Sequence, residues 1–223
     1  MFKKIIFLLF LCLSVFSNNI DDFENEFISN DKVEVDRFYK YNTFMTDFNY
    51  AIYNMSIRPV TNIYNVITPP LVKKGVDNFF HNLSSPLRFI SLLLSGEFKA
   101  SAAEFGSFLG NTILGFGGIL KPYKYEKNSD FGLMLARWGV SSGEHIVLPF
   151  FGPSNIRDAS MLPFNLLLNP SFYVNKDIGV GLTGLNIVND SSKKMLLIDE
   201  AYKSVKPYIV IRDFYEKSRE ENK

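Results

Sequence analysis

Hydrophobic and polar side chains alternate with the period of an α-helix between residues 33 and 56. In each set the positions are three or four residues apart, so the two sets occupy opposite faces. The hydrophobic set is Phe38, Tyr41, Met45, Phe48, Ile52 and Met55, and the polar set is Asp36, Lys40, Thr43, Asp47, Tyr50 and Asn54. The pattern predicts one amphipathic helix that ends at Arg58–Pro59, because the residue before a proline is biased away from helical geometry.

Capping residues and prolines divide the rest of the chain into further helices. Ser85 is expected to cap a helix that has Pro86 at its first position and Gly96 at its end. Ser129 or Asp130 is expected to cap a helix over 128–138, and Ser154 one that ends near residue 168. The remaining predicted helices are 70–82, 97–113 and a series of short polar helices in the last 48 residues, ending with 207–219. The pattern predicts an all-α fold, in which 146–151 is the one stretch that also suits a short strand.

Charged residues are scarce in the middle of the chain. Residues 100–175 contain three uncharged runs, 105–120, 145–156 and 159–175, each interrupted by glycine or proline. A membrane-spanning helix needs about 20 consecutive apolar residues, so none of these runs is long enough to span a bilayer. Two interpretations remain open at this point: a buried core of an ordinary globular domain, or short apolar helices that lie in the head-group region of one leaflet.

The first seventeen residues have the pattern of an export signal. Lys3 and Lys4 precede a twelve-residue apolar stretch, Ile5–Phe16, and Val15-Phe16-Ser17 at its end offers small residues suited to cleavage. We therefore expect a signal peptide over 1–17, a polar segment over 18–32 and a helical domain over 33–220. Cys12 is the single cysteine, and Leu11 precedes it where a lipid-attachment site has a small residue. The sequence leaves open whether Cys12 carries a lipid anchor.

The candidate chemistry of the sequence is sparse, and we expect no enzyme, cofactor or metal site. Gly139-Val-Ser-Ser-Gly143 matches the G-x-S-x-G nucleophile elbow, but neither of the two histidines follows a later acidic residue as a catalytic triad requires. Two histidines and one cysteine cannot supply a zinc site. The net charge of +1 gives no basic face for nucleic acid. Arg157–Asp158 is either a local surface pair or a polar site within an apolar region.

Four segments resemble the MlaA (VacJ) family of outer-membrane lipid-asymmetry proteins, in the order and spacing of that family. They are Tyr41–Val60 (YNTFMTDFNYAIYNMSIRPV), Phe108–Leu120 (FLGNTILGFGGIL), Phe131–Asp158 (FGLMLARWGVSSGEHIVLPFFGPSNIRD) and Pro207–Tyr215 (PYIVIRDFY). The resemblance implies a ring-like bundle of short amphipathic helices that lies in the periplasmic leaflet of the outer membrane. The sequence departs from the family pattern at three places: the lipobox is missing, Lys121 stands where an Asp is frequent, and His145 stands where Pro is common.

The resemblance also implies a function and its partners. Members of the family remove misplaced phospholipid from the outer leaflet and pass it to a periplasmic lipid carrier, and they associate with trimeric porins. The channel or platform positions carried over from the matching blocks are Asn111, Gly115, Gly117, Gly118, Phe131, Gly132, Trp138, Gly139, Leu148, Pro149, Phe151, Gly152, Arg157 and Asp158. The alternatives are a porin-associated envelope scaffold and, more remotely, a secreted serine hydrolase that uses Ser141.

Overall fold

The computed structural model describes residues 36–125 and 127–223. The expected signal peptide, the polar segment after it, Cys12 and the first residues of the helical domain lie outside the described residues. Residues 36–223 form one compact unit. Its elements are α2 (Tyr39–Ile52), η1 (Tyr53–Ile57), α3 (Arg58–Ile67), α4 (Pro70–Leu83), α5 (Ser85–Leu94), α6 (Phe98–Leu114), α7 (Phe131–Arg137), β1 (His145–Leu148), β2 (Gly152–Asn155), α8 (Ile156–Leu167), η2 (Pro170–Phe172), α9 (Lys176–Lys203) and α10 (Pro207–Glu221). The all-α prediction is confirmed, with one small hairpin added.

The first helical segment continues past the point where the sequence predicted its end. A π-helical turn, η1, joins α2 to α3, and the chain stays helical to Ile67. The prediction of a break at Arg58–Pro59 is therefore wrong. Pro59 lies in the first turn of α3, directly after the π-helical turn, and the helix continues through the proline instead of ending before it.

Two predicted helix caps are also wrong, whereas the helices themselves are present. Ser85 is the first residue of α5, and its hydroxyl donates to Glu104 of α6 instead of capping. Ser154 belongs to β2, and Asn155 caps α8 by accepting from the backbone N–H of Asp158. At α5, the Ser85 hydroxyl is used in a contact with a distant helix. At α8, the side chain of Asn155, one residue later, provides the cap that the sequence assigned to Ser154. Asp130, by contrast, caps α7 as predicted.

The hairpin and the long helix α9 depart most from the predicted pattern. β1 pairs antiparallel with β2, from His145↔Asn155 to Leu148↔Gly152, and Phe150 in the turn has a positive φ of 67°. The expected strand at 146–151 thus ends at Leu148. The expected series of short polar helices after residue 175 is instead one 28-residue helix, α9, followed by α10.

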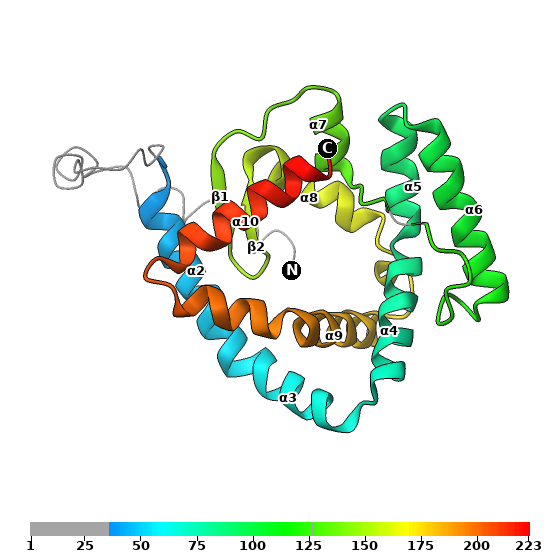
Figure 1. Cartoon of the computed structure of the whole chain (residues 1–223), viewed down its shortest axis with the longest axis horizontal. Helices are drawn as coiled ribbons and strands as arrows, with labels where there is room; N and C mark the ends of the chain where they lie inside the picture. Colours follow the sequence, from blue (N-terminus) through cyan, green and yellow to red (C-terminus); the bar gives the residue numbers. More distant parts are fainter. Residues whose placement is uncertain (1–35, 126) are drawn as a thin grey trace. The chain divides into compact units, whose positions relative to one another are not determined.

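The helices of this unit follow one another around a closed circuit. The segment α2–η1–α3 leads to α4, which packs on α9 and α5; α5 packs on α6 and α7, and α7 on α8. The last helix, α10, returns to contact α2, β2 and α9, which closes the circuit (Figure 1). None of the helices within the described ranges is both long enough and apolar enough to span a membrane.

Burial in this unit favours polar side chains over apolar ones. Among the described residues, seventeen polar or charged side chains are buried, compared with eight apolar ones, and many large hydrophobic side chains are exposed. Helix α6 illustrates the inversion: Ser101, Glu104 and Asn111 of its polar face are buried, whereas Phe98 is 68% and Ile113 74% exposed. A water-soluble globular domain buries the opposite face of an amphipathic helix.

Candidate functional site: polar cavities and the networks that frame them

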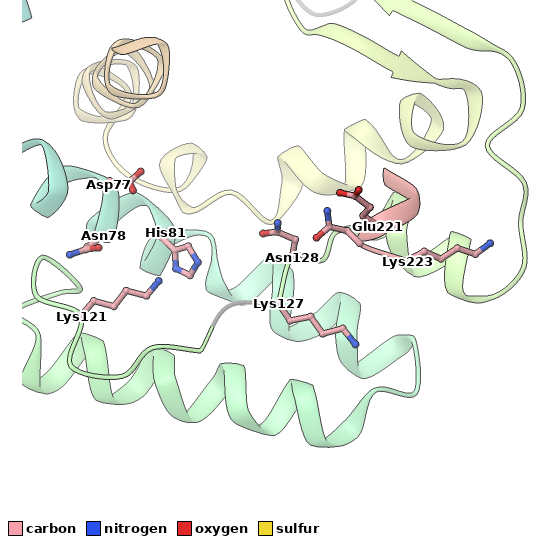
Figure 2. A pocket seen from close by; sticks show the side chains of 9 residues that line it. Asp77, Asn78, His81, Lys121, Lys127, Asn128, Glu221 and Lys223 are labelled. Carbon is pink, nitrogen blue, oxygen red and sulfur yellow. The ribbon is translucent and has the colours of Figure 1, made fainter. Parts of the chain in front are cut away.

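A cavity of about 440 Å³ opens between three parts of the circuit (Figure 2). Helix α4, the segment that follows α6, and the end of α10 each contribute charged or amide side chains to its wall. The lining residues are Asp77, Asn78, His81, Lys121, Lys127, Asn128, Glu221, Asn222 and Lys223. No large apolar side chain is among them, so the cavity is suited to a polar or charged group.

A second cavity, of about 300 Å³, shares Asn128 and Asn222 with the first. It is lined by Ser84, Leu87, Arg88, Asn128, Ser129, Asp130, Leu133, Ser218, Arg219 and Asn222. Two amide side chains belong to both walls, so the cavities adjoin, and we call the pair the polar track. Arg137 holds the end of this track in place, since Nη2 donates to the backbone carbonyl of Asn222 (3.0 Å) and Nη1 to Ser129 (2.7 Å).

A buried network of charges joins α7, α8 and α10 beside the second cavity. The guanidinium of Arg219 donates two hydrogen bonds to the carboxylate of Asp130, at 2.7 and 2.8 Å. Its Nε lies 2.8 Å from Oδ2 of Asp158 without hydrogen-bond alignment. Asp158 also accepts from Arg157 (3.0 Å) and from the hydroxyl of Tyr215 (2.8 Å). Two carboxylates and two guanidiniums therefore compensate one another in a largely buried position.

The same network shifts the pKa values of its members. Burial alone would raise the pKa of Asp130, but the hydrogen bonds and positive charge of Arg219 outweigh burial and lower it. The pKa of Tyr215 is raised, first by burial and then by the negative charge of Asp158. Asp130 is therefore ionised and Tyr215 neutral near pH 7, and Tyr215 can act as the hydrogen-bond donor that the geometry requires.

A second buried ionic contact connects α5 and α6. Nε and Nη2 of Arg88 lie 2.9 and 2.7 Å from Oε1 of Glu104, and Ser85 donates to the same oxygen. Nη2 of Arg88 also donates to the backbone carbonyl of His81 (2.7 Å) and lies 3.1 Å from Nδ1 of its ring. Arg88, which lines the second cavity, thus links the helical pair α5–α6 to α4, whose His81 lines the first.

Two asparagines of α2 hold the β1–β2 hairpin. Nδ2 of Asn42 donates to the carbonyl of His145 (3.0 Å), and its Oδ1 accepts from the N–H of Val147 (2.8 Å). Asn49 does the same two turns later, with the carbonyl of Leu148 (2.9 Å) and the N–H of Phe150 (2.8 Å). The hairpin is therefore fixed to α2 through its backbone.

The structure places several of the predicted site residues in these frameworks. Arg157 and Asp158 form a buried pair, each 8% exposed, so the surface-pair alternative is wrong. A Cβ on Gly132 would lie 2.2 Å from Oδ1 of Asp158, so only glycine lets α7 approach the network this closely. Asn111 accepts from the N–H of Tyr123 and donates to its carbonyl, both at 3.0 Å, which fixes the segment after α6.

The other predicted positions lie in turns, at the ends of helices and strands, or on exposed surface. A Cβ on Gly118, which has a φ of +96°, would lie 2.4 Å from Cβ of Asn82. Trp138 is 57% exposed and donates to the carbonyl of Leu94 (3.0 Å). Gly115 and Gly117 belong to the turn after α6, Gly139 follows α7, and Phe131 begins α7 beside Phe164. Leu148 ends β1 and pairs with Gly152, which begins β2, and Pro149 and Phe151 lie in the turn between them. In the part of the chain that the structure describes, none of the fourteen positions lines either cavity, and their role in lipid passage stays a prediction.

The sequence analysis did not predict the residues that line the cavities. It also did not predict the residues of α10 that take part in the ionic network. Tyr208, Arg212, Tyr215 and Arg219 recur on α10 at spacings of three and four. That regular polar stripe is the signal that indicates a face packed against other charged groups. The cavity lining comes from three distant segments and has no comparable pattern in the sequence.

The G-x-S-x-G segment does not have the structure of a nucleophile elbow. Residues 139–143 follow helix α7 and precede strand β1, which is the reverse of the strand-then-helix order that an elbow requires. The segment is irregular, and the carbonyl of Val140 in it accepts from Arg157 (3.3 Å).

Comparison with known proteins decides the family. The model of the MlaA lipoprotein family matches residues 34–222, almost the whole described part of the chain. The chain belongs to the MlaA family. The resemblance of the four sequence segments is thereby confirmed.

The relatives of this chain include proteins with and without a functional name. An uncharacterized protein of Rickettsia conorii is 31% identical over 216 residues, which covers 93% of this chain and 86% of the relative. The Haemophilus influenzae protein named intermembrane phospholipid transport system lipoprotein MlaA is 26% identical over 190 residues, with coverage of 78% and 74%. The Escherichia coli protein of the same name is 32% identical over 127 residues, with coverage of 53% and 50%.

A solved structure supports the fold of the family. This structure, published as "Structural basis for maintenance of bacterial outer membrane lipid asymmetry", superposes with a TM-score of 0.72 at 24% sequence identity. The match covers 84% of this chain and 98% of the solved chain. The prediction of a ring-like bundle of helices is confirmed by this likeness and by the closed circuit of helices.

Proposed function

We propose that this protein carries misplaced phospholipids out of the outer leaflet of the outer membrane and passes them to a periplasmic lipid carrier. Its relatives in Haemophilus influenzae and Escherichia coli are named as components of an intermembrane phospholipid transport system. The observation that carries the proposal is the inverted burial: polar side chains are buried or line cavities, whereas the apolar faces of helices are exposed. Such a distribution suits a protein with lipid outside and a wet passage within.

The exposed apolar faces support the proposal that the protein lies in the periplasmic leaflet. Those of α3 and α6 include Val60, Ile63, Val66, Ile67, Phe98, Phe105, Leu109, Ile113 and Leu114. About 480 Å² of apolar surface at ~25 cal/mol per Å² contributes ~12 kcal/mol, which is close to what one sixteen-carbon acyl chain contributes at ~0.8 kcal/mol per methylene. Residence in the membrane therefore does not depend on acylation of Cys12.

The polar track provides the path for the head group. A phospholipid head group left in hydrocarbon loses its hydrogen bonds with water, at a cost of several kcal/mol. Amide, hydroxyl and charged groups along the two cavities replace those hydrogen bonds, while the acyl chains follow the apolar exterior. The step is passive, so its direction comes from the carrier that removes the lipid, and a trimeric porin is the proposed neighbour that holds the protein in the membrane.

Obstruction of the track tests this function. In a Gram-negative host that lacks its own MlaA family protein, this chain should lower the amount of phospholipid that a membrane-impermeant amine-reactive reagent labels at the cell surface. Asn128→Phe narrows both cavities, because Asn128 lines both, and should abolish that effect. Lys124→Phe adds the same ring to an exposed position of the same segment and should leave the effect intact.

The alternatives give different results in the same assay. A porin-associated scaffold needs the outer surface of the protein and not the passage. Asn128→Phe and Lys124→Phe would then both lower the amount of labelled phospholipid at the cell surface, as the parent chain does. A hydrolase would lose its effect with Ser141→Ala, whereas a transport protein keeps it. Equal amounts of each variant in the outer-membrane fraction make the comparison valid.

A further inference from the structure

The corner between α3 and α4 exposes large apolar side chains in succession (Figure 1). Val66 and Ile67 at the end of α3 are 87% and 70% exposed, and Leu71 at the start of α4 is 83% exposed. Pro69 and Pro70 stand between them and have no backbone N–H that would be left unpaired in hydrocarbon. The corner is therefore suited to contact with the acyl chains of a leaflet.

Two lysines follow this corner directly on α4. The ammonium of Lys73 donates to the amide oxygen of Asn65 (2.7 Å) and lies over the ring of Tyr64, and both of these partners are neutral. Lys74 is exposed, and no residue of 36–125 or 127–223 forms an ion pair with it. Positive charge therefore borders the apolar corner.

The same arrangement recurs at the start of α6. Phe98 is 68% exposed, and Ala102 and Phe105 continue the exposed face along the helix. Lys99 beside Phe98 is exposed, and it too has no ion-pair partner in the part of the chain that the structure describes. A second apolar face thus has a lysine at its end.

The carboxylates of this part of the chain do not compensate these lysines. Residues 59–120 contain three carboxylates, and each forms an ion pair with another cation. The pairs are Asp77–Lys193, Glu97–Lys127 and Glu104–Arg88. The charges of Lys74 and Lys99 are therefore available to a group outside the protein.

A lysine at the edge of an apolar face lays its carbon stem along that face and places its ammonium among the lipid head groups. In a zwitterionic lipid the phosphate already has a cation in the same head group, whereas the phosphate of an anionic lipid such as phosphatidylglycerol has none. The net charge of the whole chain is only +1, so a general attraction to an anionic surface is weak. A preference for anionic lipid would have to come from the local charge beside the apolar faces.

We propose that the α3–α4 corner and the start of α6 form a lipid-contacting surface that favours anionic phospholipids, with Lys74 and Lys99 at their phosphates. This inference rests on the proposed function, since it takes the apolar faces of α3 and α6 to lie in a leaflet. It concerns the lipids that surround the protein and not the lipid that passes through the polar track.

Binding to vesicles of two compositions tests the preference. The full chain, purified in mild detergent, is diluted into vesicles of phosphatidylcholine alone or of phosphatidylcholine with a minor fraction of phosphatidylglycerol, and the bound share is measured after flotation. The parent chain should bind the anionic vesicles more tightly, and added salt should reduce this preference because it screens exposed charges. Lys74→Gln and Lys99→Gln should each weaken binding to the anionic vesicles about five-fold, which corresponds to ~1 kcal/mol for one basic residue at an anionic surface. Binding to phosphatidylcholine alone should not change.

Matched variants separate the possible results. Lys74→Arg keeps the charge and should keep the preference, and Lys217→Gln removes the same charge from α10, outside the proposed surface, and should keep it as well. Equal binding of the parent chain to both kinds of vesicle, or the same loss in Lys217→Gln as in Lys74→Gln, would overturn the inference and leave the proposed function standing. Failure of the parent chain to bind either kind of vesicle would instead contradict the place in a leaflet on which the proposed function depends.

Discussion

Arg219 and Asp130 form a bidentate ion pair that connects the last helix of the chain to the N-terminus of α7. Asp130 also caps α7, because its Oδ1 accepts a hydrogen bond from the backbone N–H of Leu133. The pair lies in the wall of the second cavity, and Asp158 extends it to α8. The network that positions three helices therefore also shapes the polar track.

Removal of Arg219 should destabilise the protein strongly. Arg219→Gln leaves Asp130 and Asp158 without their shared cation in a largely buried position, and breaking a buried pair in this way costs about 3–5 kcal/mol. Thermal unfolding in detergent, followed by circular dichroism, measures the loss. Lys217→Gln on the same helix, whose side chain is 77% exposed, is the control and should change the stability by less than about 0.5 kcal/mol. Equal stability of the two variants would show that the network contributes nothing.

Acid should weaken the same contact. The pKa of Asp130 is lowered in the folded protein, so its ion pair contributes stability above the unfolded value of 3.8, and that contribution is lost as the pH falls through the lower folded value. The melting temperature, followed from neutral pH down to below the unfolded pKa, should therefore fall more steeply for the parent chain than for Asp130→Asn. Asparagine keeps an oxygen for the helix cap, so the two curves should converge at low pH. Parallel curves would contradict the assignment.

Asn42 should be as important to the hairpin as the ionic network is to the helices. Asn42→Ala removes the acceptor for the N–H of Val147 and the donor to the carbonyl of His145, both buried, at a cost of about 1–3 kcal/mol for each group. Hydrogen exchange of the hairpin amides should accelerate, and the melting temperature should fall. Thr43→Val on the same helix removes a buried hydroxyl that has no hydrogen-bond partner among residues 36–125 and 127–223, and it should leave both measurements unchanged. Slow exchange in Asn42→Ala would mean that the strands hold the hairpin without α2.

Helix positions followed from the sequence, but the direction of their faces did not. The period of α6 is correct, and Glu104 and Phe105 lie on the faces that the pattern separates. An amphipathic pattern predicts that a helix has two different faces, but it does not predict which face packs against the protein interior. In α6 the polar face packs there. The ionic partner of Glu104, Arg88, lies on another helix, and no local pattern links the two residues.

The hairpin and the cavities depend on contacts between distant segments. β2 is Gly-Pro-Ser-Asn, which has no alternating apolar pattern, and it becomes a strand because β1 and the asparagines of α2 supply its framework. Lys121 and Glu221 line the same cavity, although they are 100 positions apart in the sequence. The family resemblance indicated the fold and the glycine-rich turns but not the lining of the passage.

The inverted burial requires lipid against α6 and water in the polar track. Single cysteines for spin labels are placed at Ile113, on the exposed apolar face, and at Asn128, in the cavity wall, with Cys12→Ser so that each label is unique. In phospholipid vesicles, the label at 113 should be accessible to oxygen and protected from a water-soluble nickel reagent, and the label at 128 should show the reverse. A label at 113 that collides freely with the nickel reagent, together with one at 128 that does not, would contradict this orientation of the protein's faces.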